Sequence, residues 1–334
     1  MQQVAVIGSG SWGTALAVHL AHVGHGVTLW GRDASLVAEM RQRRANPIYL
    51  PDIVFPARLE TTDDLGAALP TASVVVMAVP SHGVRAVAKR MAGHLRPGAL
   101  VVSAVKGLEA QSLLRMSEVL GQELPMAGEV AVMSGPSFAV ELARALPTAV
   151  VVASTSAATV EHVQAEFRSP WLRLYGTADV IGVEIGGAMK NTIAIAAGVV
   201  EGLGQGHNAL AALITRGLAE LTRLAVAMGG QRETLSGLAG LGDLVLTCTG
   251  ALSRNRHVGA ELARGRSLAE VVASTKMVAE GVRTTEAALA LGERAGIELP
   301  ITTQMAHVLS GRLSARDALG ELMVRPQRAE PEPG

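Results

Sequence analysis

Residues 3–13 read QVAVIGSGSWG, and they carry the strongest indication of the fold of the first half of the chain. It contains the apolar run VAVIG (4–8), which has the length of one buried strand. The run leads into GSGSWG (8–13), which fits the pattern G-x-G-x-x-G, and then into a segment with helical periodicity. A glycine loop between a strand and a helix is typical of the first βα unit of a doubly wound sheet.

The three glycines of this loop have separate roles if the loop binds a dinucleotide. Gly8 permits a tight turn, Gly10 lets a pyrophosphate approach the backbone, and Gly13 lets the helix pack on the strand. The helix N-terminus would offer free N–H groups to the phosphates. We therefore expect a dinucleotide site. The alternatives are a glycine-rich turn in an unrelated sheet and an S-adenosylmethionine site.

The pattern of short apolar runs separated by helical segments continues to about residue 178. Further Val-rich runs occur at 27–30, 74–79, 100–105, 130–134 and 149–154. Because such runs are apolar on both faces and alternate with helical segments, they predict parallel strands covered by helices. The fold class is therefore α/β at the N-terminus, a Rossmann-type doubly wound parallel sheet.

The composition changes after Tyr175, which is the last aromatic residue of the chain. Helical periodicity then runs through 179–202, 207–229, 253–264, 278–295 and 300–310, which predicts an all-α second domain. We expect a dinucleotide-binding domain at 1–178 and a helical substrate and catalytic domain at 179–325. Residues 326–334 are rich in proline and charge and predict a disordered tail.

Charge and composition exclude several classes of protein. The 334 residues include 29 Lys plus Arg and 29 Asp plus Glu, so the zero net charge gives no reason to expect a nucleic-acid partner. No uninterrupted apolar run reaches the roughly 18 residues that span a bilayer, and the N-terminus lacks a signal peptide's basic region. Cys248 is the one cysteine and allows no intrachain disulfide. We expect a soluble, cytoplasmic protein without an integral membrane segment.

A metal site is not expected. His19, His22 and His25 are spaced three residues apart, but no acid or cysteine joins them. We expect Cys248 to be a small buried apolar residue, since no His or Asn partner accompanies it in the sequence.

Two charged residues, Arg32 and Asp33, follow the second predicted strand. An acid at this strand end holds the ribose hydroxyls in NAD-specific sites, whereas an arginine accommodates the 2′-phosphate of NADP. Asp33 could instead cap a helix that begins at Ala34. We therefore expect NADPH to be favoured, with NADH left open.

Later strand ends carry further candidates. Lys106 follows the run at 100–105, and the segment SGPS (134–137) follows the run at 130–134. Ligands of open α/β sheets bind at these carboxyl ends, where a lysine suits a phosphate or a developing alkoxide. The alternative for Lys106 is an ordinary surface lysine.

Lys190 lies in the helical segment EIGGAMKN (184–191). Helical side chains lean toward the N-terminus, so Lys190 covers Gly186 and Gly187. Each glycine costs about 1 kcal/mol relative to alanine in a helix interior. We expect the pair to leave space for a small ligand beneath the ammonium, and the alternative is close helix–helix packing.

Two more segments carry polar candidates. Asp243 ends the stretch GLAGLGD (237–243), where it could orient Lys190, bind a substrate hydroxyl or serve as a turn residue. Ser253 and Arg254 precede a helical segment, and a capped helix start beside an arginine makes a phosphate site. Simple capping with an exposed arginine is the alternative.

Together these residues resemble the bacterial-type NAD(P)-dependent sn-glycerol-3-phosphate dehydrogenase family. The matching pieces run in order through nearly the whole chain: GSGSWGTALA, LWGRD, VVVMAVPS, SAVKGLE, MSGPSFAVE, EIGGAMKN, GLAGLGDLVLTCTG, SRNR and VAEGVRT. The resemblance implies reduction of dihydroxyacetone phosphate to sn-glycerol 3-phosphate for phospholipid synthesis. It implies that Lys190 is the catalytic acid and base. Asp33 stands where many relatives carry a less acidic residue, which leaves the strength of the NADP preference open.

The resemblance also implies the ligand contacts. Substrate contacts would come from Lys106, Gly135, Ser137, Lys190, Asp243, Ser253, Arg254 and Asn255. Nucleotide contacts would come from Ser11, Trp12, Arg32, Lys106, Ala139, Arg254, Val278 and Glu280, together with Gly8, Gly10 and Gly13.

Two other functions are alternatives to this one: a 3-hydroxyacid or 6-phosphogluconate-type dehydrogenase, and a non-catalytic nucleotide sensor. Apolar helical surface in the second half makes a homodimer a further expectation.

Overall fold

The structure, a computed structural model, describes residues 1–274, 280–327 and 329. The chain divides into two compact units, and each is treated by itself. Unit 1 comprises residues 1–106 and 114–183, and unit 2 comprises residues 107–113 together with the described residues from 184 onward. The predicted tail at 326–334 lies largely outside the described residues, and the division at 178/179 stays a prediction.

Unit 1 is built on an eight-stranded sheet of order β10-β9-β8-β7-β6-β1-β2-β5. The strands are β1 (Gln3–Ile7), β2 (Gly26–Trp30), β5 (Leu59–Thr62), β6 (Val74–Met77), β7 (Leu100–Ser103), β8 (Val130–Ser134), β9 (Thr148–Ala153) and β10 (Leu172–Thr177). Neighbours from β8 to β5 pair in parallel, which confirms the doubly wound parallel sheet.

The last two strands depart from the expected direction. β9 pairs antiparallel with β8, and β10 pairs in parallel with β9. A parallel return needs a crossover of about a dozen residues or more, usually a full helix. Between β8 and β9 the chain forms only the short α6 (Ala139–Ala143), so β9 returns in the opposite direction.

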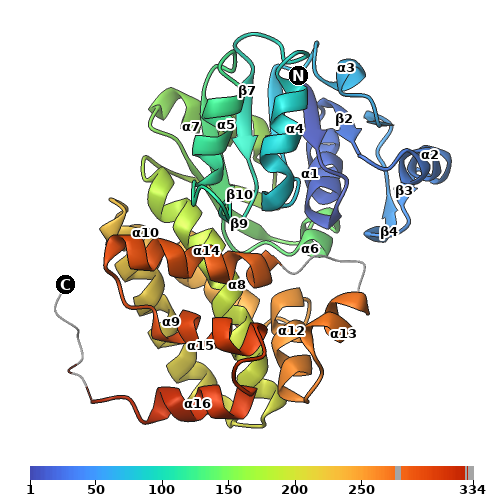
Figure 1. Ribbon diagram of the computed structural model, residues 1–334. Coiled ribbons are helices and arrows are strands. Elements are labelled where there is room, and N and C mark those ends of the chain that lie inside the picture. The colour runs from blue at the N-terminus through green and yellow to red at the C-terminus, as the bar shows by residue number, and fades with distance from the viewer. Residues whose placement is uncertain (275–279, 328, 330–334) are drawn as a thin grey trace. The chain divides into compact units, whose positions relative to one another are not determined.

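Helices cover both faces of the sheet, as the sequence predicted. Val4 and Val6 face one core, and Ala5 and Ile7 face the other. The first core packs against α1 (Ser11–His22), α2 (Ala34–Arg43), α6 and α7 (Ala157–Phe167). The second packs against α3 (Leu65–Ala68), α4 (Val84–Met91) and α5 (Met116–Glu123), and Figure 1 shows α4 and α5 side by side in front of the strands.

Two short elements complete unit 1. A 3-10 turn, η1 (Ser81–Gly83), leads into α4. An antiparallel hairpin of β3 (Ala45–Asn46) and β4 (Leu50–Val54) follows α2.

The described part of unit 2 is helical. Its helices are α8 (Val180–Gly202), which begins at the end of unit 1, α9 (Gly206–Ala227), α10 (Arg232–Ser236), α11 (Asp243–Thr249), α12 (Arg254–Ala263), α13 (Leu268–Ala273), α14 (Glu280–Ala295), α15 (Pro300–Leu309) and α16 (Ala315–Met323). A π-helical turn, Leu238–Gly242, leads into α11. The five predicted helices are confirmed, although the predicted start of the fourth at 278 lies outside the described residues.

α8 is the core helix of unit 2. It is long and apolar enough to cross a membrane by length and composition, but 89% of its most apolar window is buried inside the protein. Its apolar character therefore reflects packing against other helices of the unit.

The backbones of α8 and α12 touch at two glycines. A Cβ atom on Gly198 would lie 1.9 Å from the carbonyl oxygen of Arg256, and one on Gly259 would lie 1.9 Å from that of Ile195. No side chain fits at either position. This crossing therefore fixes where α12 begins along α8.

The histidines predicted not to bind metal take structural positions in unit 1. The Nε2 atom of His19 bonds to the carbonyl oxygen of Phe167 (2.7 Å), and its Nδ1 atom accepts from Trp171 Nε1 (3.1 Å). Burial lowers the pKa of His19 to about 4, so its ring is neutral at neutral pH. His25 bonds to the carbonyl oxygen of Glu166 (2.8 Å). Within the ranges that the structure describes, no group of His, Cys, Asp or Glu is arranged to hold a metal ion.

Candidate active site

The glycine loop has the geometry that its three roles require. Gly8 has φ of +121°, and a Cβ atom there would lie 2.7 Å from the carbonyl carbon and oxygen of Ala78. A Cβ atom on Gly13 would lie 1.9 Å from the carbonyl oxygen of Gly8. A Cβ atom on Gly10 would meet nothing within 4 Å. Gly8 and Gly13 are thus required by packing, whereas Gly10 leaves its outer side open to a ligand.

The N-terminus of α1 follows Gly10 and carries no competing anion. Gly10 supplies no side-chain cap, and the first turn contains no acidic residue. The unused N–H groups and the positive end of the helix dipole therefore favour a phosphate. Ser11 and Trp12 begin the helix and are half-buried, and the buried Nε1 atom of Trp12 has no hydrogen-bond partner among the described residues. These features fit the pyrophosphate of a dinucleotide.

Arg32 and Asp33 differ in whether their side chains have hydrogen-bond partners within the described residues. The Oδ1 atom of Asp33 accepts from the backbone N–H groups of Ser35 (3.0 Å) and Leu36 (3.1 Å), so Asp33 is the N-cap of α2. The capping alternative for this residue is confirmed. The Arg32 side chain is exposed and has no partner within the part of the chain that the structure describes.

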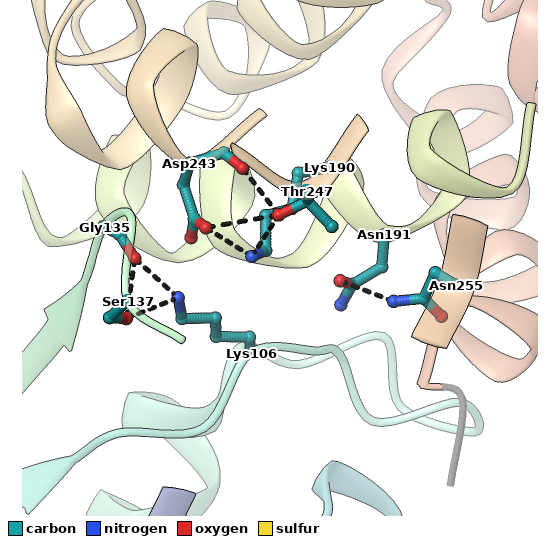
Figure 2. A network of polar contacts seen from close by, with 8 residues as sticks. All are labelled: Lys106, Gly135, Ser137, Lys190, Asn191, Asp243, Thr247 and Asn255. Carbon is teal, nitrogen blue, oxygen red and sulfur yellow. Dashed lines mark hydrogen bonds and ion pairs between the residues drawn. The ribbon is translucent and has the colours of Figure 1, made fainter. Parts of the chain in front are cut away.

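Lys106, Gly135 and Ser137 come together at the carboxyl ends of β7 and β8, as Figure 2 shows. The Nζ atom of Lys106 donates to the carbonyl oxygen of Gly135 (2.8 Å) and lies 3.5 Å from Ser137 Oγ. Ser137 Oγ donates to the same carbonyl (2.9 Å). Gly135 has φ of +134°, which suits the sharp turn after β8. Ala139 begins α6, which packs beside α1.

Lys190 and Asp243 form a buried ion pair in unit 2. The Nζ atom of Lys190 donates to Asp243 Oδ1 and to Thr247 Oγ1 (2.8 Å). The Thr247 hydroxyl donates to the backbone carbonyl of Asp243 (2.6 Å), which leaves its lone pairs for the ammonium. Burial of two charges is costly, and their pairing offsets much of that cost. Thr247 was not among the residues predicted from the sequence; the signal for it is its place four residues after Asp243, on the same face of one helix.

Gly186 corrects one expectation. A Cβ atom on Gly186 would lie 2.7 Å from the carbonyl oxygen of Ala239, in the π-helical turn before Asp243. This glycine therefore permits close packing, and the expectation that it leaves space for a ligand is wrong. The close contact sets the position of Asp243 relative to α8.

The start of α12 carries the other predicted residues of unit 2. Ser253 is its N-cap, with Oγ accepting from the N–H of Arg256 (3.3 Å), and Arg254 is exposed. Buried Asn255 donates from Nδ2 to Asn191 Oδ1 (2.9 Å), as Figure 2 shows, and accepts from the N–H of Gly281 (3.0 Å).

Glu280, Val278 and Cys248 are the remaining residues considered from the sequence. Glu280 begins α14, and Val278 lies outside the described residues. Cys248 is buried, as predicted, and burial raises the pKa of its thiol to about 12. A thiol of that kind is not a nucleophile at neutral pH.

Comparison with known proteins identifies the family. Two family models match, described as NAD-dependent glycerol-3-phosphate dehydrogenase N-terminus (residues 3–160) and C-terminus (residues 179–320). The chain is 50% identical to glycerol-3-phosphate dehydrogenase (NAD(P)+) of Koribacter versatilis, with 99% of each chain covered. It is 51% identical to the protein of the same name from Citrifermentans bemidjiense, with 98% of this chain and 99% of that one covered.

A solved structure agrees. The crystal structure of glycerol-3-phosphate dehydrogenase from Coxiella burnetii is 41% identical and superposes with a TM-score of 0.94, covering 97% of this chain and 99% of that one. At these identities, over nearly the full length, the relatives share one family and not the fold alone. The chain therefore belongs to the NAD-dependent glycerol-3-phosphate dehydrogenase family.

Proposed function

We propose that the protein catalyses the NAD(P)H-dependent, reversible reduction of dihydroxyacetone phosphate to sn-glycerol 3-phosphate, without a metal. The product would supply glycerophospholipid biosynthesis. The observation that carries the proposal is the buried Lys190–Asp243 pair, in a chain of this family. A buried ammonium with fixed acceptors is suited to proton transfer at one defined atom.

Lys190 supplies the proton of this reaction. When bound, NAD(P)H supplies a hydride for the C2 carbonyl carbon. The Lys190 ammonium donates its proton to the carbonyl oxygen, and in the reverse direction the amine removes the proton from the C2 hydroxyl. Asp243 and Thr247 hold Nζ in place before the substrate arrives, which reduces the entropy cost of reaching the reactive geometry.

Binding of the substrate phosphate is assigned to the start of α12. Exposed Arg254 and the helix N-terminus capped by Ser253 both favour an anion. Asn255 is assigned to the substrate as well, and its bond to Asn191 ties it to the residue beside Lys190. In unit 1, Lys106, Gly135 and Ser137 are assigned to the substrate on the family resemblance and their mutual contacts.

The nucleotide is assigned to the glycine loop and the start of α1, with contacts from Ser11 and Trp12. Lys106, Ala139, Arg254, Val278 and Glu280 are further assignments from the family resemblance. NADPH is proposed as the favoured cofactor, because Arg32 is exposed while the carboxylate of Asp33 caps α2.

A direct assay tests the reaction. The purified protein should oxidise NADPH when dihydroxyacetone phosphate is added, with NADP+ and glycerol 3-phosphate formed in equal amounts. A 3-hydroxyacid or 6-phosphogluconate should give much slower turnover in the oxidative direction. If either competitor were oxidised faster than glycerol 3-phosphate, it would replace the proposed substrate. Absence of turnover with all of these compounds would favour a nucleotide sensor.

Two variants test the cofactor preference. Arg32→Ala should raise the KM for NADPH by about tenfold or more and leave the KM for NADH nearly unchanged, because only NADPH carries the 2′-phosphate. Asp33→Asn keeps a good N-cap for α2 and removes the charge. A large rise in the KM for NADH in Asp33→Asn would show that Asp33 holds the ribose and would contradict the preference.

The protein is further proposed to act in the cytoplasm as a homodimer, through apolar helical surface of unit 2. Light scattering on the eluted protein should give twice the mass of the chain. A monomer at micromolar concentration would contradict this assignment.

A further inference from the structure

Asn46 is a completely buried polar residue that the glycine-loop motif does not include. Its Nδ2 atom donates to the carbonyl oxygen of Ser9 (2.9 Å) and to Thr14 Oγ1 (2.9 Å). Its Oδ1 atom accepts from the N–H groups of Ile48 (3.3 Å) and Tyr49 (3.2 Å). An amide has two N–H donors and two acceptor lone pairs, and here all are used. The network therefore determines the orientation of the amide.

The Ser9 carbonyl accepts from Asn46 and, at the longer distance of 3.4 Å, from Thr14 Oγ1, which Asn46 also holds; these bonds fix the peptide between Ser9 and Gly10. Because a trans peptide is planar, its C=O and N–H groups point in opposite directions. With the Ser9 carbonyl held by Asn46, the Gly10 N–H points away from Asn46. Gly10 lies on an open side of the loop and precedes the uncapped N-terminus of α1.

The orientation of this peptide depends on hydrogen bonds from side chains, because glycines flank Ser9. Gly8 and Gly10 on either side of Ser9 make rotation of the segment easy. A rotated peptide would present the carbonyl oxygen, with its partial negative charge, to an incoming phosphate. A loop ordered only on binding would also weaken affinity through its lost freedom. The hydrogen bond from buried Asn46 opposes both effects.

The segment that carries Asn46 is itself anchored within unit 1. Arg44 ends α2 with φ of +51°, and its guanidinium donates to the carbonyl oxygens of Leu59 (2.9 Å) and Pro56 (2.6 Å). The N–H of Phe55 donates to the Arg44 carbonyl (2.6 Å). These bonds fix the start of the β3–β4 hairpin and, with it, the position of Asn46.

We propose that Asn46 is a positioning residue for the nucleotide: it holds the Ser9 carbonyl so that the Gly10 N–H and the start of α1 face the pyrophosphate. This inference rests on the proposed nucleotide site. It extends that site to a residue 37 positions along the chain from Ser9.

Calorimetric titration with NADPH and NADH tests the proposal in Asn46→Ala. Both dissociation constants should rise by about tenfold or more, and by the same factor, because both nucleotides carry the pyrophosphate. The kcat at saturating NADPH should stay within about twofold of wild type, because Asn46 orders only the binding loop. Asn46→Ser, which is too short to reach Ser9, should behave alike and replaces Asn46→Ala if that variant fails to fold.

Val163→Ala is the matched control, because Val163 is a fully buried residue of the same core and makes no hydrogen bond to the loop. It should lower the unfolding temperature without raising either dissociation constant. If the Asn46 variants lower the unfolding temperature but keep both constants within about twofold of wild type, the residue is merely structural and the inference is overturned. If wild type binds neither nucleotide, the proposed function fails instead.

Discussion

Lys190 and Asp243 are bonded to each other almost out of contact with water: their side chains are 8% and 1% exposed. The partners come from α8 and from the first turn of α11, and Thr247 provides the lysine with a second acceptor. Removal of either charge takes the ion-pair partner away from a buried charge, which commonly costs several kcal/mol. The arrangement therefore ties the stability of unit 2 to the geometry of the proposed proton donor.

Asp243→Asn should lower both activity and stability. Asparagine keeps the shape and one acceptor oxygen but removes the carboxylate charge that pairs with the Lys190 ammonium. We expect kcat to fall by about tenfold or more and the free energy of unfolding to fall by about 3 kcal/mol. Steady-state kinetics and urea unfolding measure the two quantities.

A second ion pair on the same helix provides the control for Asp243→Asn. Glu201 pairs with Arg256 at 2.5 Å but is 48% exposed. Glu201→Gln should therefore leave kcat unchanged and cost at most about 1 kcal/mol. Equal losses in Glu201→Gln and Asp243→Asn would show that burial of the Lys190 pair has no special importance.

Gly259→Ala should separate α12 from α8. The added Cβ would lie 1.9 Å from the Ile195 carbonyl oxygen, so the helices must move apart and carry Ser253 and Asn255 with them. We expect a loss of roughly 2–3 kcal/mol in unfolding free energy, together with a higher KM for dihydroxyacetone phosphate.

Gly320 in α16 provides the control for Gly259→Ala, since a Cβ there meets nothing within 4 Å. Gly320→Ala should be neutral or stabilise by up to about 1 kcal/mol, and a comparable loss in both variants would contradict the account.

Glu220 makes the stability of unit 2 depend on pH. It accepts from the N–H groups of Ile301 (2.5 Å) and Thr302 (3.2 Å) at the start of α15, yet burial raises its pKa to about 7. Its folded-state pKa lies above the unfolded value, so its contribution is complete below about pH 4.5 and is lost as the pH rises through about 7. Wild type should lose about 2–3 kcal/mol relative to Glu220→Gln between pH 5 and pH 8.

Denaturant unfolding of wild type and Glu220→Gln across this pH range measures the difference directly. Because both proteins contain His19, whose lowered pKa acts in the opposite direction, the comparison isolates Glu220. A difference in stability that stays constant with pH would contradict the raised pKa.

Periodicity predicted most of the fold, because burial on two faces of a strand or one stripe of a helix leaves a regular apolar pattern. It could not give strand direction: β9 is Val-rich like the parallel strand β7, although it runs antiparallel to β8. It also missed β5 and β10, edge strands of the sheet with exposed polar positions. The π-helical turn before Asp243 has a glycine-rich sequence without helical spacing.

Residues with distinctive local sequence were the ones that could be predicted in the candidate site. Lys190 beside a glycine pair, Asp243 in an apolar stretch and Ser253 at a helix start each have such a signal. Asn191 and Asn46 acquire their roles only from contacts 64 and 37 residues away in the chain, and Thr247 has one local signal, its spacing from Asp243, beside its contact to Lys190 57 residues away. The packing role of Gly186 could not be predicted for the same reason, since its neighbour Ala239 lies in a distant segment of the chain.

Turnover by the Lys190→Ala variant is the decisive measurement for the proposed proton donor. The kcat for reduction of dihydroxyacetone phosphate should fall by about 100-fold or more, because Lys190 is the proposed proton donor to the C2 oxygen. The dissociation constant for NADPH should remain within about twofold of wild type, since Lys190 has no part in the nucleotide loop, and this binding also verifies that the variant is folded. A kcat close to that of wild type in a folded Lys190→Ala variant would contradict the assignment of Lys190 as the catalytic acid and base.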